Sequence, residues 1–263
     1  RTAEEGPSMA KQKRLIQSIK RASDILGIFI QEKRTMGITD FSSRLHLPKT
    51  TISSIVQTLE ALRFLEKDHI TSKYRLGPAL FQLGMKYATN MDLVIIARAW
   101  MERLCFQFME PVNVGMLVGD KVIVVLRVEP ENRFMVFPQA GSVIPVHTTC
   151  IGKILYAHMP ADERNQILRN YPFEKLTSNS IDEREVFTKE LERVKKEGIA
   201  FDNEESIVGL AGIGGPIFNY TGQAVAGFVI TGKSEHIRKE REKMITAVRY
   251  TSGQVSSQLG YTP

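Results

Sequence analysis

One short segment carries three residues of types used in covalent catalysis, each three positions after the last: His147, Cys150 and Lys153. Residues three apart share a face if the segment is helical, and a histidine beside a cysteine can then activate the thiol as a nucleophile. No acidic residue that would orient the histidine is fixed nearby in the sequence. The same segment, entering a helix after Pro145, would also offer free N–H groups to an anion. Catalysis by His147 and Cys150 and binding of a carboxylate are therefore the two interpretations of this segment.

A second group of reactive side chains lies further along the chain, at Asp202, Glu204 and Glu205. Three carboxylates can bind a metal ion, but without histidines at ligand spacing they are also typical of a solvated turn. The two cysteines, Cys105 and Cys150, are too few for a disulfide framework or a zinc site. We expect Cys105 and the single Trp100 to lie in a core, and we expect no metal and no cofactor.

A different chemistry is indicated near the N-terminus, on a helix expected to begin at Pro48. Its apolar residues recur at helical spacing and define an inward side, namely Ile52, Ile55, Val56, Leu59 and Leu62. At 100° per residue the opposite side carries Thr50, Ser53, Ser54 and Gln57, flanked by Lys49. Small hydroxyls and an amide suit a helix that enters a DNA groove. A merely polar surface is the alternative.

The surrounding segments are those that would hold such a helix against DNA. Residues 18–30 carry an amphipathic pattern, and residues 38–45 form a short second helix with Thr39 near its start. Residues 64–67 and 73–77 read as two strands around a turn. Three helices followed by a hairpin predict a winged helix-turn-helix, with Lys67, His69, Lys73 and Arg75 of the wing near the phosphates.

The charge distribution agrees with a nucleic-acid-binding module. Residues 1–77 contain 14 Lys and Arg against 8 Asp and Glu, whereas the remaining residues contain 21 of each, so the whole net charge of +6 lies in the first third. A solvated basic surface with no partner would show the same excess. The length of 263 residues favours two domains.

The rest of the chain predicts an α+β domain. A linker helix is expected at residues 78–90 and an amphipathic helix at 92–109, whose inward residues include Leu93, Ile96, Met101, Leu104 and Phe108. Strands are expected at residues 112–118 and 121–128 around a Gly119-Asp120 turn, and at 133–138, 213–218 and 223–231. Further helices are expected after Pro145, at residues 182–196, and from a cap at Ser234 to Leu259. Together they imply an antiparallel sheet flanked by helices.

These residues resemble the IclR family of bacterial transcription regulators. The N-terminal matches are Ser18 to Ala22 with Ile25-Leu26, Leu47 to Thr51, Leu59 to Leu62, and Tyr74 to Gly77; the C-terminal matches are Pro145 to His147, Gly152-Lys153, Gly198 to Glu205, Gly209, Pro216 and Gly222. The resemblance implies a winged helix-turn-helix at residues 13–77, a linker helix at 78–91 and a GAF-like effector-binding domain at 92–263, after a disordered lead at 1–12. It covers nearly all of residues 18–260.

The resemblance also implies site residues. Arg44 and Thr51 join the DNA-contact set, and the family's effector pocket maps onto Cys150, Ile151, Asp202, Gly212, Val229 and Thr231. Met116, Leu117, Phe134 and Met135 are expected as apolar lining from strand position alone. Where members that sense small acids have polar groups, this chain has Gly212 and Val229. We therefore expect an effector larger or more apolar than a two- or three-carbon keto acid.

The function expected is a ligand-responsive regulator, a repressor of a catabolic operon, that binds a palindromic operator as a dimer or tetramer. No apolar stretch approaches the roughly 20 residues of a membrane span, so we expect a cytoplasmic protein with no membrane partner. Two alternatives stay open. One is an enzyme whose N-terminal module is an adaptor, and the other is a constitutive DNA-binding protein with a purely structural second domain.

Overall fold

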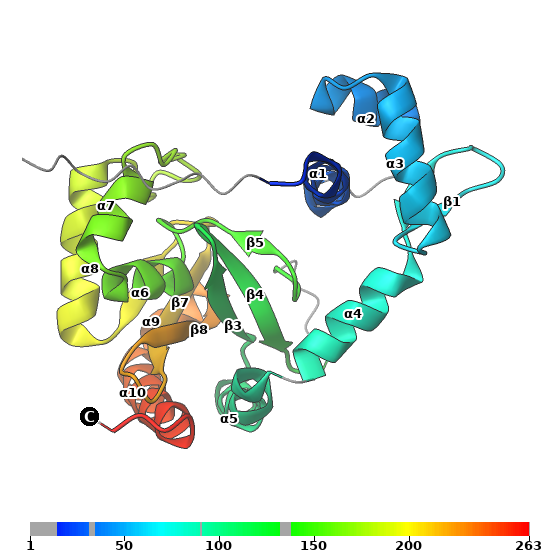
Figure 1. Cartoon of the computed structure of the whole chain (residues 1–263). Coiled ribbons are helices and arrows are strands. Elements are labelled where there is room, and N and C mark those ends of the chain that lie inside the picture. Colours follow the sequence, from blue (N-terminus) through cyan, green and yellow to red (C-terminus); the bar gives the residue numbers. More distant parts are fainter. Residues whose placement is uncertain (1–14, 32–34, 90, 132–137, 263) are drawn as a thin grey trace, which may run out of the picture. The chain divides into compact units, whose positions relative to one another are not determined.

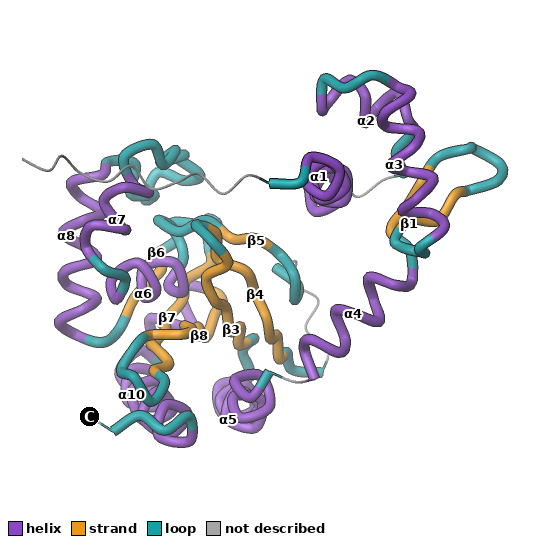
Figure 2. Tube along the Cα trace, viewed as in Figure 1, coloured by secondary structure: helices purple, strands orange, loops and turns teal. Residues whose placement is uncertain are grey.

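The computed structural model describes residues 15–31, 35–89, 91–131 and 138–262. The chain forms two compact units, residues 1–87 and residues 88–263. Figures 1 and 2 show their helices and strands. The expected lead at residues 1–12 and most of the expected strand at 133–138 lie outside the described residues, and Pro138 itself is not in a strand.

The N-terminal unit is a winged helix-turn-helix, as the sequence predicts. Its elements are α1 (Gln17–Gln31), α2 (Ile38–Leu45), α3 (Lys49–Ala61), β1 (Leu65–Lys67), β2 (Tyr74–Leu76) and α4 (Pro78–Thr89). Ile25, Phe41, Ile52, Val56 and Leu65 are fully or almost fully buried between the three helices and the hairpin. These apolar side chains hold α3 in place with its opposite side exposed.

Two details of these helices differ from the sequence-based expectation. α2 is capped by Asp40, whose carboxylate accepts the N–H of Gly37 at 2.8 Å, while Thr39 lies inside the first turn. The carboxylate at the third helical position reaches back to the unpaired N–H before the helix. Leu62 is 57% exposed because α3 ends at Ala61, before Leu62 can turn inward.

The C-terminal unit is built on one six-stranded antiparallel sheet. Its elements are α5 (Asp92–Phe108), β3 (Val112–Val118), β4 (Lys121–Val128), β5 (Val143–Ile144), α6 (Cys150–His158), α7 (Ala161–Leu168), α8 (Arg184–Glu197), β6 (Ala200–Asn203), β7 (Leu210–Phe218), β8 (Ala224–Lys233), α9 (Ser234–Lys239) and α10 (Arg241–Gln258). The strand order is β5-β4-β3-β8-β7-β6. This is the α+β arrangement predicted, with the hairpin at Gly119-Asp120 in place.

Helices cover both faces of this sheet. α6 lies on β7, β8 and β3 with α8 packed against it, while α5 and α10 lie on the other face (Figure 1). The pairing of β3 with β4 shifts between Val114 and Gly115, which leaves Val125 as an extra residue in β4. Because of this extra residue, the alternation of β4 side chains between the two faces of the sheet is reversed on the far side of the bulge. Val122 and Val124 accordingly belong to the α6 side and Leu126 to the α5 side.

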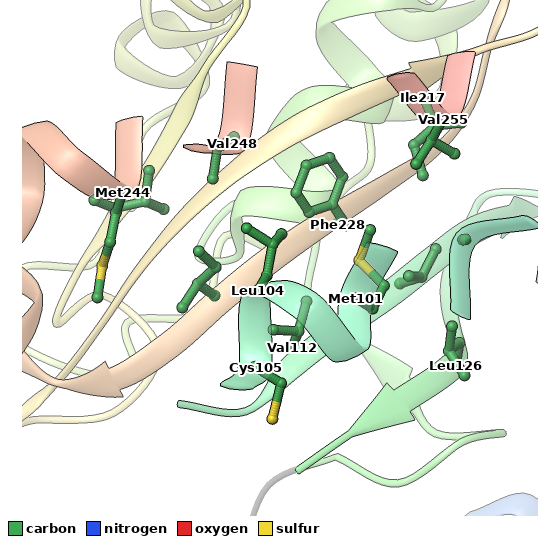
Figure 3. Close-up of a cluster of buried hydrophobic side chains, with 14 of the residues drawn as sticks. Met101, Leu104, Cys105, Val112, Leu126, Ile217, Phe228, Met244, Val248 and Val255 are labelled. Carbon is green, nitrogen blue, oxygen red and sulfur yellow. The ribbon is translucent and has the colours of Figure 1, made fainter. Parts of the chain in front are cut away.

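The larger core lies between the sheet and the helices α5 and α10. Figure 3 shows Met101 and Leu104 of α5 near Phe228 of β8, with Met244 and Val248 from α10. Cys105 is buried here, and Trp100 packs half-buried at its edge against Tyr250. Both residues are therefore core residues, as expected.

The predictions from sequence omitted three short elements, β5, α7 and β6, and were wrong about the last helix. The expected single helix from Ser234 to Leu259 is two helices separated at Glu240, and Ser234 is the first residue of α9, with Lys233 at the cap position. No helix in the described part of the chain combines the length and apolar character needed to cross a bilayer.

Candidate effector cavity and DNA-binding face

A cavity of about 210 Å³ lies where the start of α6 faces the sheet of the C-terminal unit. Its wall is mostly apolar and is contributed by Asn113, Val124, Pro138, Ile144, Pro145, Thr149, Cys150, Ile151, Leu176, Asp202, Ser206, Ile207, Leu210, Val229 and Thr231. Five of the six residues expected from the family resemblance are in this set: Cys150, Ile151, Asp202, Val229 and Thr231. A small organic molecule fits this space better than a macromolecule does.

The start of α6 supplies hydrogen-bond donors to the cavity. Thr149 caps the helix: its Oγ1 accepts the N–H of Gly152 at 3.2 Å and donates to the carbonyl of Pro145. Among the described residues, the N–H groups of Cys150 and Ile151 meet no hydrogen-bond acceptor. Unpaired N–H groups at a helix start attract an anion. This end of the cavity is suited to a carboxylate.

The loop before α6 is held by side-chain hydrogen bonds. The Tyr171 hydroxyl accepts the N–H of Val146 at 3.0 Å and lies 3.0 Å from Nδ1 of His147, and Nε2 of His147 lies 2.9 Å from the carbonyl oxygen of Glu174. These contacts fit a neutral His147 whose Nε2–H donates to Glu174, and burial lowers its pKa. His147 is therefore a positioning residue for the loop, anchored away from Cys150.

Cys150 has the environment of an apolar wall residue. It is 1% exposed, and burial raises the pKa of its thiol well above the ordinary value. A nucleophilic cysteine needs the opposite shift. His147 lies before α6 and not on its face, so the expected alignment of His147 with Cys150 on one helix is absent. The arrangement does not support covalent catalysis.

The carboxylates near the end of β6 point to separate partners. Asp202 Oδ1 accepts the N–H of Glu205 at 2.8 Å, Glu204 pairs with Arg238 at 3.2 Å, and Glu205 Oε1 lies 2.6 Å from Lys153 Nζ. Within the part of the chain that the structure describes, no three metal-ligating side chains gather at one point. The three residues are thus used for turn formation and charge pairing, and burial raises the pKa of Asp202, which lines the cavity.

Gly212 lies beneath the cavity wall without lining it. A Cβ built on it would stand 2.9 Å from Cγ2 of Val229 and 3.5 Å from Sγ of Cys150. Only a glycine lets these two wall residues approach so closely. Gly212 therefore shapes the cavity by leaving room, which agrees with the absence of a polar side chain at this point.

Of the four lining residues expected from strand position, Met116 and Leu117 are described, and neither falls in the cavity wall. Met116 lies on the strand face of Val112 and Val114, which belong to the other core, because successive strand residues alternate between faces. Leu117 is on the α6 side but packs into the core below. Phe134 and Met135 lie outside the described residues.

Residues that the sequence did not single out complete the wall, notably Asn113, Val124, Leu176 and Ser206. A signal existed for Asn113 alone, as a polar residue within the apolar run Val112 to Val114. Val124 lies next to the bulge of β4, and Leu176 and Ser206 lie in loops. Sequence periodicity does not predict which way such residues point.

A second candidate site is the exposed side of α3. Lys49, Thr50, Ser54 and Gln57 are exposed, while Thr51 and Ser53 are half-buried on its two flanks. The 100° rotation per residue predicts this exposed set, except that Ser53, predicted with it, is half-buried. Arg44, near the end of α2, is exposed as well. These side chains form one polar surface, with Thr51 and Ser53 at its borders.

The wing adds basic side chains to this unit. Lys67, His69, Lys73 and Arg75 are all exposed on or near the hairpin. Its turn is held by Asp68, which accepts the N–H groups of Ile70 and Thr71 at 2.8 and 3.1 Å. Arg75 is already engaged, with its guanidinium 3.0 Å from Glu66 on the neighbouring strand. The lysines of the wing are therefore more available than Arg75 for contact with DNA phosphates.

Comparison with known proteins identifies the domain family of each unit. Residues 18–69 match the model of the IclR helix-turn-helix domain, and residues 85–257 match the C-terminal domain of bacterial transcriptional regulators of the IclR type. Together the two matches span most of the chain, including α3 and the cavity.

Full-length relatives carry the same arrangement. The chain is 31% identical to the glycerol operon regulatory protein of Streptomyces coelicolor, over 94% of this chain and 98% of the relative, and 29% identical to the transcriptional regulator KdgR of Escherichia coli, over 95% of each. The solved structure of an IclR homologue of Microbacterium hydrocarbonoxydans, complexed with 4-hydroxybenzoate, has the same fold, with a TM-score of 0.79 at 20% identity over 92% of this chain and 98% of that one. These relatives are regulators and not enzymes. The chain belongs to the IclR family of ligand-responsive, DNA-binding transcriptional regulators.

Proposed function

We propose that this regulator represses a catabolic operon. An organic acid bound in the C-terminal cavity controls its affinity for the operator. The observation that carries the proposal is the cavity itself: its wall is mostly apolar, and at one point it has helix N–H groups without a partner among the described residues. The name of the glycerol operon relative supports an operon for the use of a carbon source. We assign DNA binding to residues 13–77, linkage to 78–91 and sensing to 92–263.

We infer that the effector is an aromatic or longer-chain acid. Gly212 and Val229 present no hydrogen-bonding side chain, and Cys150 and Ile151 add apolar surface. Burial of an apolar body contributes about 25 cal/mol per Å². A two-carbon or three-carbon keto acid leaves most of this wall uncovered. The complex of the related regulator with 4-hydroxybenzoate supports an aromatic acid.

Isothermal titration of the purified protein tests the effector class. We expect 4-hydroxybenzoate, benzoate or a six-carbon acid to bind more tightly than glyoxylate and pyruvate. Replacing Asp202 by Ala should weaken the best ligand, because it removes the Oδ1 that accepts the N–H of Glu205 in the turn beside the cavity. Tighter binding of glyoxylate or pyruvate than of every larger acid would overturn this assignment of the pocket.

We propose that the polar side of α3 reads the major groove. The hydroxyls of Thr50 and Ser54 and the amide of Gln57 lie together there, with Lys49 at the helix start and Thr51 and Ser53 on the flanks. A glutamine amide can pair with both polar atoms of an adenine edge. Arg44, Lys73 and Arg75 would contact phosphates beside the reading helix.

We infer that the regulator binds a palindromic operator as a dimer, and that two such dimers associate into a tetramer. Phe81, Leu83 and Tyr87 of α4 are 71%, 59% and 63% exposed. At 100° per residue Leu83 and Tyr87 lie on one side of α4 and Phe81 on the other, and a helix with apolar residues on both sides is normally buried. A second copy would bury them around a two-fold axis. Analytical ultracentrifugation tests this: Phe81→Glu with Leu83→Glu should give monomers, and an unchanged oligomer would place the interface elsewhere.

A gel-shift assay with DNA from upstream of the neighbouring gene tests the function as a whole. We expect sequence-specific retention that weakens with salt and is released by the effector. Retention of unrelated DNA to the same degree, or turnover of the acid without any DNA binding, would contradict it.

A further inference from the structure

We propose that Asn113 selects effectors that carry a hydroxyl group at the end remote from Asp202. Asn113 lies in β3 and lines the cavity, although it is only 4% exposed. Its Oδ1 is buried and has no hydrogen-bond partner among the described residues. This inference rests on the proposed effector site and adds a chemical requirement to it.

An unpaired amide in such a place needs an explanation. Buried polar groups in folded proteins are almost always hydrogen-bonded, and removal from water without a partner is unfavourable. The flanking residues, Val112 and Val114, are fully buried and apolar, so a valine at this position would suit the strand equally well. The amide gains its partner when the cavity is filled.

The position of Asn113 sets where that partner must be. Asn113 is paired in register with Val229 of β8, while Thr231 of β8 is paired with Gly212 of β7, and Gly212 with Asp202 of β6. Three strand spacings therefore separate Asn113 from Asp202. At about 4.8 Å per spacing, their backbones are about 14 Å apart along the sheet. A three-carbon acid cannot reach both residues.

The sheet between these two residues contributes one polar side chain to the wall, Thr231. Val229 is apolar, and Gly212 presents no side chain. A ligand that reaches Asn113 therefore has an apolar middle, with its carboxylate at the start of α6 and a polar group beyond. An asparagine amide both donates and accepts. A hydroxyl matches it in either direction, and this makes an elongated hydroxy acid the ligand class that satisfies the whole cavity.

Matched pairs of acids that differ by one hydroxyl test the proposal. The probes are 4-hydroxybenzoate against benzoate and 6-hydroxyhexanoate against hexanoate, titrated by calorimetry into the full-length protein. The wild type should prefer the hydroxylated member of a pair by about threefold to tenfold, which is the net value of one hydrogen bond. Asn113→Val should abolish this preference while leaving or improving the affinity for the member without the hydroxyl.

Two further variants separate recognition from a structural effect. Asn113→Asp keeps an acceptor for the hydroxyl and should retain the preference, whereas Thr231→Val removes a different polar group from the same wall and should leave the preference intact. Thermal unfolding shows whether each variant folds, and if Asn113→Val does not fold, Asn113→Ser, whose side chain is too short to reach the ligand, takes its place.

The outcomes distinguish this inference from the function on which it rests. An equal preference for the hydroxylated acid in wild type and Asn113→Val would overturn the role of Asn113 and leave the effector site standing. Equal affinity of wild type for both members of each pair would do the same. Failure of all four acids to bind the wild type would overturn the proposed effector class and this inference together.

Discussion

Lys153 Nζ lies 2.6 Å from Oε1 of Glu205, and the two side chains are 1% and 6% exposed. Lys153 also donates to the carbonyl of Phe201 at 2.8 Å and lies 3.7 Å from Glu190 of α8. The ammonium group thus joins α6 to β6, which carries Asp202, and to the turn after this strand. This ion pair fixes the two walls of the cavity relative to each other.

Removal of Lys153 should destabilise the protein strongly. Lys153→Met leaves the buried carboxylate of Glu205 without its cation, and breaking a buried pair costs about 3–5 kcal/mol of unfolding free energy. Urea unfolding followed by circular dichroism measures the loss. Lys175→Met is the matched control, because Lys175 pairs at 2.8 Å with Asp182 on the exposed surface, and it should unfold like the wild type. The double variant Lys153→Met with Glu205→Leu should recover much of the loss, and no recovery would show that the pair does not act as a unit.

Acid binding should depend on pH through Asp202. Burial raises the pKa of this carboxyl above its ordinary value of about 3.9. The native state therefore holds the proton to higher pH than the unfolded chain, and the contribution of Asp202 to stability falls as pH rises through the raised pKa. A protonated Asp202 also repels an anionic ligand less. Affinity for 4-hydroxybenzoate should rise as pH falls from neutrality toward that raised pKa, and Asp202→Asn should flatten the profile. An identical profile in the variant would remove Asp202 from the titration.

Replacing Thr50, Ser54 and Gln57 together by alanine should abolish operator recognition without unfolding the domain. The three side chains lie on the exposed side of α3, away from the core residues Ile52 and Val56. A good bidentate base contact contributes about 1–3 kcal/mol of discrimination. Fluorescence anisotropy with operator DNA measures the affinity. Thr246→Ala, which removes an exposed threonine of α10, serves as the control. Operator binding by the triple variant at wild-type strength would assign reading to another element.

The salt dependence of DNA binding should distinguish the basic residues of the module. Each neutralised phosphate contributes about 0.9 to the slope of log affinity against log salt. Lys49→Ala should flatten the slope by about that amount, whereas Arg75→Ala should change it less, because Glu66 already engages the Arg75 guanidinium. Glu66→Gln should in turn strengthen DNA binding. A larger change for Arg75→Ala than for Lys49→Ala would mean that the ion pair opens completely on DNA.

The sequence was a good guide where apolar periodicity governs the structure. The spacing of Ile52, Val56 and Leu59 placed α3 and its exposed side, and the hairpin around Gly119-Asp120 placed β3 and β4. The cap of α2 was missed because Thr39 and Asp40 are both good capping residues, and only the backbone shows which one reaches Gly37.

The cavity was predicted only in part, for a physical reason. The family resemblance pointed to Cys150, Ile151, Asp202, Val229 and Thr231, which share the wall, but a count along the strand put Met116 there as well. Strand alternation places Asn113 on the cavity side and Met116 on the other. Long-range pairing, such as that of Lys153 with Glu205, leaves no trace in local spacing.

We propose that a ligand in the cavity controls DNA binding, and the decisive measurement is operator affinity as a function of effector concentration. The comparison is between wild type and Val229→Phe, whose added ring would fill the space beside Gly212. Both proteins should bind operator without effector. The best-binding acid should shift the affinity of the wild type by about fivefold to 150-fold, the usual range of allosteric coupling, and should leave the variant unaffected. An equal shift in the two proteins, or no shift in the wild type while calorimetry shows the acid bound, would contradict the claim.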